Sequence, residues 1–192
     1  MSKNTLSIFR MRSVLFTLAL LVLSGLSACG GGSSPAAPSP SAPAQVGGLW
    51  TGNATRTGVT GGECLGPVIG NSSDRSPRIS VTIQQTGSQL TATVTNTLYA
   101  AACTYSGSAG PTTISLALQS CQGGKVNNMK CPNGDLRDME LVADAFTGTV
   151  DASGIGGTEE QRWNTFVGGT STATGPLVIN SAFALKRGPF AD

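Results

Sequence analysis

Short segments in which apolar and polar residues alternate run through most of this chain, and they constrain its fold more than any other feature. Residues 79–83 and 90–95 alternate on either side of a turn-like stretch at 85–89, so residues 78–96 are predicted to form a hairpin. Further strands are expected at 49–57, 103–106, 114–118, 139–142, 146–150, 177–179 and 183–187. The last two segments predict a hairpin or one bent strand.

About eight short strands, regularly spaced and separated by turns, are typical of an antiparallel barrel or sandwich. Charged residues make up only 11% of the chain, Gly, Thr and Ser are abundant, and no long segment is rich in helix formers. We therefore expect an all-β, antiparallel domain of about eight strands, either closed into a barrel or folded as a β-sandwich.

The two ends of this domain favour the barrel. Arg187 shares a strand face with Phe183 and Leu185, which should point into the core. Closing a barrel brings the first and last strands together, so the Arg187 guanidinium can lie over the Trp50 indole. The Gly-x-Trp pattern at 48–50 and the arginine on the last strand resemble the lipocalin family, or more broadly the calycins. The resemblance implies a lipocalin-like barrel, although the Thr-Asp-Tyr motif and the C-terminal helix of typical lipocalins are missing. In the alternative, Trp50 and Arg187 are unrelated.

The first 28 residues have the layout of an export signal. Lys3, Arg10 and Arg12 precede an apolar run at 14–23, which is about half of the roughly 20 residues that a membrane-spanning helix needs. The Leu-Ser-Ala-Cys sequence at 26–29 follows and resembles the lipobox of bacterial lipoproteins.

The lipobox resemblance implies a specific fate for Cys29. The chain would be cleaved before it, and the cysteine would carry the acyl chains that anchor the protein in a membrane. By the same resemblance Gly30, which is not Asp, points to the outer membrane of the cell envelope. The alternatives are an ordinary cleaved signal with a chance cysteine, or a transmembrane anchor.

The composition changes after the signal. Residues 29–45 are Gly, Ser, Pro and Ala almost throughout and predict a disordered or partly extended tether, followed by the β-barrel domain at 46–187 and a short tail at 188–192. The chain has 12 basic and 10 acidic residues, and removing the three basic residues of the signal leaves 9 and 10. This balance gives no clustered positive surface, so we expect no nucleic-acid partner.

Four cysteines remain besides Cys29: Cys64, Cys103, Cys121 and Cys131. An even number in an exported domain predicts disulfides, and three pairings are possible. We favour Cys121–Cys131, because the residues between them are typical of a loop, and therefore Cys64–Cys103. A four-cysteine zinc site is the alternative, although the chain has no Cys-x-x-Cys pair.

The chain contains no histidine, which excludes a Ser-His-Asp triad, a Cys-His pair and histidine-ligated zinc. Asp135, Asp138 and Glu140 are candidates for acid–base work or Ca²⁺ binding. A solvated outer face beside Arg137 is the better interpretation of these three residues. The glycine-rich stretch 154–157 lacks the ending of a phosphate loop and is expected to be a hairpin turn.

Tyr99, Tyr105, Trp163 and Phe166 can line a cavity or fill the core. We expect no catalytic, cofactor or metal site, and a non-catalytic, lipid-anchored module of the cell envelope. Its expected partners are the membrane, through the lipid on Cys29, and either a small apolar ligand inside the barrel or an envelope protein or glycan. One alternative is a structural or protein-interaction module with a filled core, which the many large apolar residues favour slightly. Another is a carboxylate-based hydrolase, which needs two acidic groups that converge in a pocket.

Overall fold

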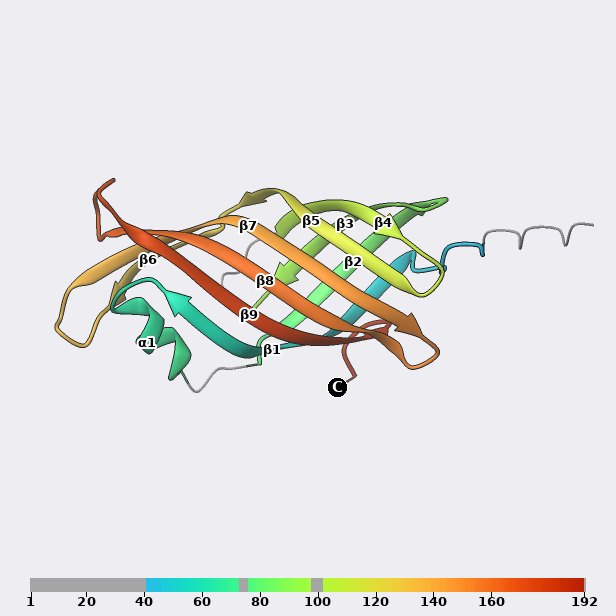
Figure 1. Ribbon diagram of the computed structural model, residues 1–192, viewed down its shortest axis with the longest axis horizontal. Coiled ribbons are helices and arrows are strands. Elements are labelled where there is room, and N and C mark those ends of the chain that lie inside the picture. Colours follow the sequence, from blue (N-terminus) through green and yellow to red (C-terminus); the bar gives the residue numbers. More distant parts are fainter. Residues whose placement is uncertain (1–40, 73–75, 98–101, 192) are drawn as a thin grey trace, which may run out of the picture. The chain divides into compact units, whose positions relative to one another are not determined.

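The computed structural model describes residues 41–72, 76–97 and 102–191, in which nine strands form one sheet (Figure 1). The strands are β1 (Gly48–Gly61), β2 (Arg78–Thr86), β3 (Gln89–Asn96), β4 (Ala102–Ala109), β5 (Thr113–Gln122), β6 (Lys125–Lys130), β7 (Leu136–Asp151), β8 (Gly154–Val167) and β9 (Ala173–Arg187). The helix α1 (Leu65–Gly70) lies between β1 and β2. No helix among the described residues is long and apolar enough to cross a membrane. The expected lipidation site Cys29, and Tyr99, lie outside the described residues.

Eight of the strands close into an antiparallel barrel. Neighbours pair in the order β5-β4-β3-β2-β1-β9-β8-β7, and the pairing of β5 with β7 closes the ring. Residues 145–149 of β7 pair with β5, whereas residues 136–140 pair with β6. β6 therefore continues the barrel wall past the end of β5. The sheet is the predicted barrel with one additional strand, and the β-sandwich alternative is wrong.

Several strands are longer than the alternation predicts. The segments 139–142 and 146–150 belong to one strand, β7, and the two C-terminal segments form the single strand β9. The hairpin turn expected between the strands on either side of residues 151–154 is present at residues 152–153, but it does not extend over 154–157, because these glycine-rich residues begin β8. Gly157 pairs with Gly148 of β7, and a Cβ on Gly157 would lie 2.0 Å from the Thr147 carbonyl oxygen. These glycines permit a close approach of strands.

A bulge in β7, between Leu141 and Ala143, changes which side chains of this strand point inward. Before the bulge Met139 and Leu141 are buried, and after it Asp144 and Phe146 are buried. The extra residue shifts the alternation by one position, which turns the following side chains to the opposite face. The bulge therefore places an acidic side chain inside the barrel.

Two disulfides join the four cysteines of the domain, Cys64 with Cys131 and Cys103 with Cys121. The pairing favoured from the sequence is wrong, and so is the zinc alternative. Cys103 and Cys121 lie directly opposite each other on β4 and β5, with their Cα atoms 4.1 Å apart. The segment between Cys121 and Cys131, expected to be a loop, contains β6, which carries Cys131 to Cys64 at the start of α1.

Candidate functional site

A cavity of about 180 Å³ lies at the end of the barrel where α1 and β6 are located (Figure 1). Most of its lining is apolar, with Ser72, Arg56 and Gln161 as the polar members. The lining side chains come from the barrel strands, from α1 and from β6: Arg56, Val68, Ile69, Ser72, Val126, Met129, Met139, Gln161, Trp163 and Ile179. Trp163, one of the aromatic residues considered from the sequence, thus contributes to this cavity, while Tyr105 is buried in the core.

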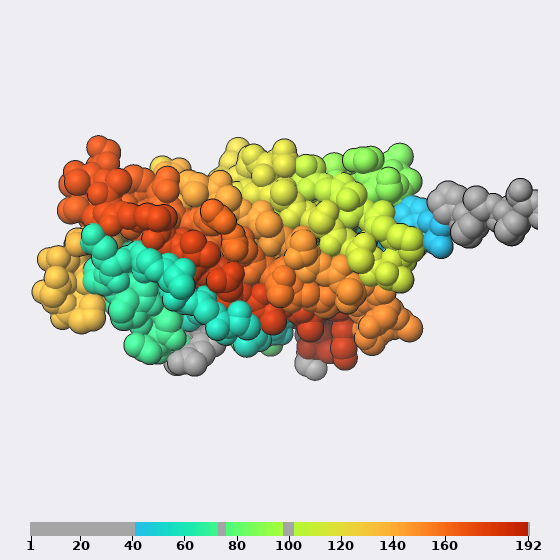
Figure 2. Space-filling view, in the orientation of Figure 1, coloured from blue at the N-terminus to red at the C-terminus, as the bar shows by residue number. Residues whose placement is uncertain are grey.

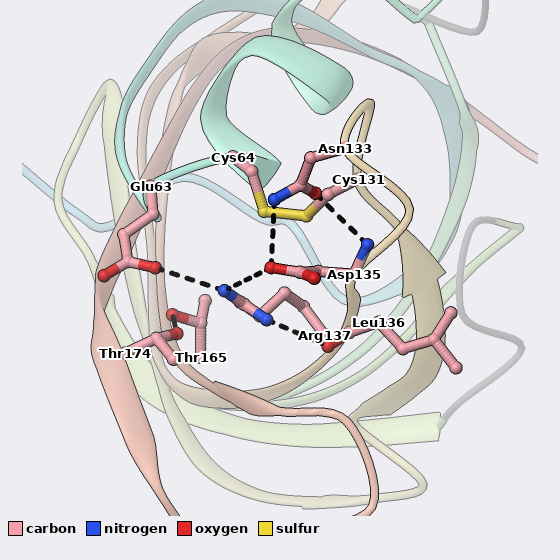
Figure 3. The surroundings of a disulfide bond; sticks show 9 residues. All are labelled: Glu63, Cys64, Cys131, Asn133, Asp135, Leu136, Arg137, Thr165 and Thr174. Atoms are coloured by element: carbon pink, nitrogen blue, oxygen red, sulfur yellow. Dashed lines mark hydrogen bonds and ion pairs between the residues drawn. A yellow bond between two sulfur atoms is a disulfide. The ribbon is translucent and has the colours of Figure 1, made fainter.

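The Cys64–Cys131 disulfide connects two walls of this cavity (Figure 3). Cys64 immediately precedes α1, which contributes Val68, and Cys131 immediately follows β6, which contributes Met129. The Arg56 guanidinium also donates a hydrogen bond to the Ile69 carbonyl of α1. The helix is therefore fastened to β6 by a covalent bond and to β1 by a hydrogen bond.

The acidic candidates of β7 and its preceding turn do not converge. The Asp135 carboxylate pairs with the Arg137 guanidinium at 3.4 Å, and Glu63 pairs with the same guanidinium at 3.7 Å (Figure 3). The Arg137 side chain is only 14% exposed. This ion-pair cluster lies beside the Cys64–Cys131 disulfide and tethers the start of β7 to the end of β1.

Asp138 and Glu140 line a separate hollow of about 200 Å³ together with Lys125 and Phe166. The Asp138 carboxylate accepts the backbone N–H groups of Asn128 and Gly169, each at 2.8 Å. These backbone hydrogen bonds lower the pKa of Asp138. Glu140 pairs with Lys125 at 3.3 Å. Asp138 therefore fastens β6 and the turn between β8 and β9 as an ionised carboxylate. No group of three or more potential metal-ligating acidic, Cys or His side chains occurs in the described residues.

A different pair of carboxyls does converge, deep inside the barrel. Asp144 of β7 and Glu159 of β8, called the carboxyl pair below, are each only 2% exposed. Asp144 pairs with Gln161 and Phe146 pairs with Glu159, so the two acids are diagonal neighbours on the inward face of β7 and β8. The charge of Glu159 contributes to the raised pKa of Asp144. Gln161, rather than either acid, lines the cavity. The two carboxyls are thus next to the cavity and separated from it by one side chain.

Donors from three side chains surround the carboxyl pair. The Tyr105 hydroxyl donates to Asp144 Oδ2 at 2.7 Å, and the Gln161 amide donates to Glu159 Oε1 at 2.8 Å. The Gln161 carbonyl in turn accepts the Trp163 indole N–H at 3.3 Å. A continuous hydrogen-bonded path therefore leads from the carboxyl pair through Gln161 to Trp163 on the cavity wall.

Burial changes the protonation of both acids. It raises the pKa of Glu159 to about 7, against the weaker opposing effect of the Gln161 hydrogen bond. Burial, followed by the charge of Glu159, raises the pKa of Asp144 well above its usual value. Removing a carboxylate from water disfavours its charged form, and a second carboxylate nearby disfavours it further. The chemistry available to this pair is the uptake and release of a proton.

The sequence did not lead us to the carboxyl pair, although the alternation of residues in β8 does place one of its two acids, Glu159, inside the barrel. Counting in twos from Ile155 or from Trp163 places Glu159 on the inward face of its strand. Asp144 is on the inward face when counted back from Phe146, but on the outward face when counted forward from Leu141. The β7 bulge decides between these two results.

The remaining predicted residues lie at the opposite end of the barrel. Trp50 and Arg187 face each other across the β1–β9 ladder, with the guanidinium over the indole ring. No protein-family model, curated protein or solved structure matches this chain.

Proposed function

We propose that this protein is a non-catalytic lipoprotein of the cell envelope, anchored in the outer membrane through lipid on Cys29, whose barrel binds a small apolar ligand. The observation that carries the binding function is the cavity of about 180 Å³ between the barrel strands, α1 and β6. Its apolar lining favours an apolar ligand, and Gln161 and Arg56 offer the few polar contacts that orient a bound molecule.

The cavity volume limits the size of the ligand. Ligand sites for drug-sized molecules usually enclose about 300–1,000 Å³, whereas an apolar cavity of about 150 Å³ holds a benzene molecule. We therefore propose a ligand part of about one aromatic ring, or a short alkyl segment. Eight-stranded barrels have room for one such molecule beyond their own side chains.

The place where the chain enters the barrel supports an accessible cavity. Gln85 of β2 holds the segment 44–47, through which the chain enters the domain. Its amide N–H donates to the Ala44 carbonyl at 2.8 Å, and its amide oxygen accepts the Val46 N–H at 2.7 Å. This entry point and the α1–β6 end lie at opposite ends of the barrel (Figures 1 and 2). The chain therefore enters the barrel at the end away from the cavity.

Titration with N-phenyl-1-naphthylamine, a neutral fluorescent apolar probe, tests the binding function. Val68→Trp adds volume on the cavity wall, and we expect it to weaken probe binding by tenfold or more, on the order of 1.4 kcal/mol. Val142→Trp makes the same change at a residue that is 49% exposed on β7 and should leave binding unchanged. Equal affinities for both variants, or no binding to the wild-type barrel, would refute the proposal.

A further inference from the structure

When both acids are ionised, the carboxyl pair inside the barrel lacks one hydrogen-bond donor. Asp144 Oδ1 is buried and, with both acids ionised, has no hydrogen-bond partner among the described residues. Two buried carboxylates in contact repel each other, and an unpartnered buried acceptor costs free energy. One proton placed between the two acids removes both penalties, because it forms an O–H···O hydrogen bond from one carboxyl to the other.

The groups around the pair do not supply a positive charge in place of that proton. Tyr105 from β4 is the other titratable group in contact, and it already donates to Asp144. The inward-facing neighbours on β5 and β9, Leu116 and Ser181, are uncharged, as are the buried residues of β2 and β3. Arg56 of β1 lines the cavity and donates to the carbonyl of Ile69.

We propose that Asp144 and Glu159 share a proton in the folded barrel and that its release to solvent loosens the cavity wall formed by Gln161 and Trp163. The wall is affected because Gln161 donates to Glu159 at 2.8 Å and accepts from Trp163 at 3.3 Å. When the proton leaves, the two carboxylates repel each other. Glu159 and the Gln161 amide bonded to it then shift together, and the position of the Trp163 ring is less tightly fixed. The barrel is therefore a ligand carrier that responds to pH; the effect on binding rests on the proposed function, whereas the shared proton does not.

The sign of the pH dependence follows from the raised pKa values. A carboxyl in the unfolded chain titrates near pH 4, whereas the pKa of Glu159 in the folded barrel is about 7. Between these values the folded state holds a proton that the unfolded state has lost. The stabilisation is complete below about pH 4 and is lost as the pH rises to about 7. The unfolding equilibrium constant should rise by up to about tenfold per pH unit across this window.

Urea denaturation of the wild-type barrel between pH 4.5 and pH 8 tests the shared proton. We expect the urea midpoint to fall steadily as the pH rises to about 7. The fall should be clearly smaller in Glu159→Gln, whose neutral amide can donate to Asp144, while the buried Asp144 still titrates. Glu160→Gln, on the same strand and in an exposed ion pair with Arg162 at 2.9 Å, is the control and should keep the wild-type profile. Parallel profiles for wild type and Glu159→Gln would overturn the proposal.

A measurement on the wild-type protein makes the test independent of whether the variant folds. Infrared spectroscopy of the folded barrel at pH 6 should show the C=O band of a protonated carboxylic acid, because the exposed carboxyls are ionised there. The band should weaken as the pH rises through about 7, in step with the loss of stability. A folded barrel without this band at pH 6 would refute the shared proton.

Binding of N-phenyl-1-naphthylamine at pH 5.5 and pH 8 tests the effect on the cavity. We expect the wild-type affinity for the probe to be about two- to tenfold weaker at pH 8 than at pH 5.5, the range that corresponds to one net hydrogen bond. The Glu159→Gln variant should bind the probe equally well at both pH values. Equal wild-type affinities at the two pH values would overturn the coupling. An absence of probe binding at either pH would overturn the proposed function, while the urea profiles and the infrared band would still decide whether the proton is shared.

Discussion

The Arg187 guanidinium lies over the Trp50 indole, with its central carbon 4.5 Å from the ring centroid. The two residues are direct partners across the seam between the first and last strands. The Arg187 amino groups also donate to the carbonyl oxygens of Gly47 and Gln45, at 2.7 and 2.9 Å, and the indole N–H donates to the Val46 carbonyl at 2.7 Å. This contact therefore fastens the incoming chain segment to the barrel seam.

Arg187→Ala should destabilise the barrel more than Lys186→Ala. The first change removes a cation–π contact and two hydrogen bonds, and we expect it to lower the free energy of unfolding by about 1–3 kcal/mol. Lys186 points outward on the same strand and is exposed, so its truncation should cost less than about 0.5 kcal/mol. Urea denaturation of both variants measures the difference, and equal effects would refute the role of the Trp50–Arg187 contact.

The strands and their closure were predictable because alternation is a local property of the sequence. Trp50 and Arg187 lie on strands whose order follows from closing any antiparallel barrel, so their proximity was also predictable. The Cys103–Cys121 pair was predictable in principle. Cys103 begins one predicted strand and Cys121 lies three residues beyond the predicted end of the other, and extending these strands as a hairpin brings the two residues opposite each other.

The α1–β6 end was not predictable from local sequence. α1 has six residues, two of which are the glycines Gly66 and Gly70 and one of which is Pro67, so no helical periodicity marks it. Its position depends on the Cys64–Cys131 disulfide and on the hydrogen bond from Arg56, which are contacts between distant parts of the chain. The cavity, whose walls include α1 and β6, was therefore not predictable from the sequence either.

Replacing the two disulfides separately should show that they contribute unequally. Cys64→Ser with Cys131→Ser opens a loop spanning 67 residues, and Cys103→Ser with Cys121→Ser a loop spanning 18. Loop-closure entropy predicts losses of about 4 and about 3 kcal/mol in the free energy of unfolding. Urea denaturation under non-reducing conditions measures both.

The first double variant should also weaken binding of the fluorescent probe, because that disulfide joins two walls of the cavity. The second should leave probe affinity close to wild type in the folded fraction, since Cys103 and Cys121 lie outside the cavity lining. A larger binding defect in the second variant would contradict the assignment of the cavity.

Cys29→Ala should abolish incorporation of radiolabelled palmitate and move the protein from the membrane fraction to the soluble fraction. The lipobox resemblance predicts that this cysteine is the acylated residue, and several acyl chains are needed for stable anchoring. The Cys103→Ser, Cys121→Ser variant is the matched control, because it removes cysteines and should remain labelled. Palmitate incorporation that persists in Cys29→Ala would refute the lipid anchor.

Tyr105→Phe should reveal how far the carboxyl pair depends on its hydroxyl donor. Phenylalanine can keep the edge-on contact with Phe146, whose ring centroid is 5.5 Å away, while Asp144 Oδ2 loses its partner at 2.7 Å. We expect the free energy of unfolding to fall by about 1–3 kcal/mol. The loss should be larger at pH 8 than at pH 5, because an ionised carboxylate depends more on a donor than a protonated one.

Thr104→Val removes an exposed hydroxyl from the adjacent position of β4 and should cost less than about 0.5 kcal/mol at either pH. A Tyr105→Phe effect that is the same at both pH values would mean that the hydroxyl does not sense the charge of the pair.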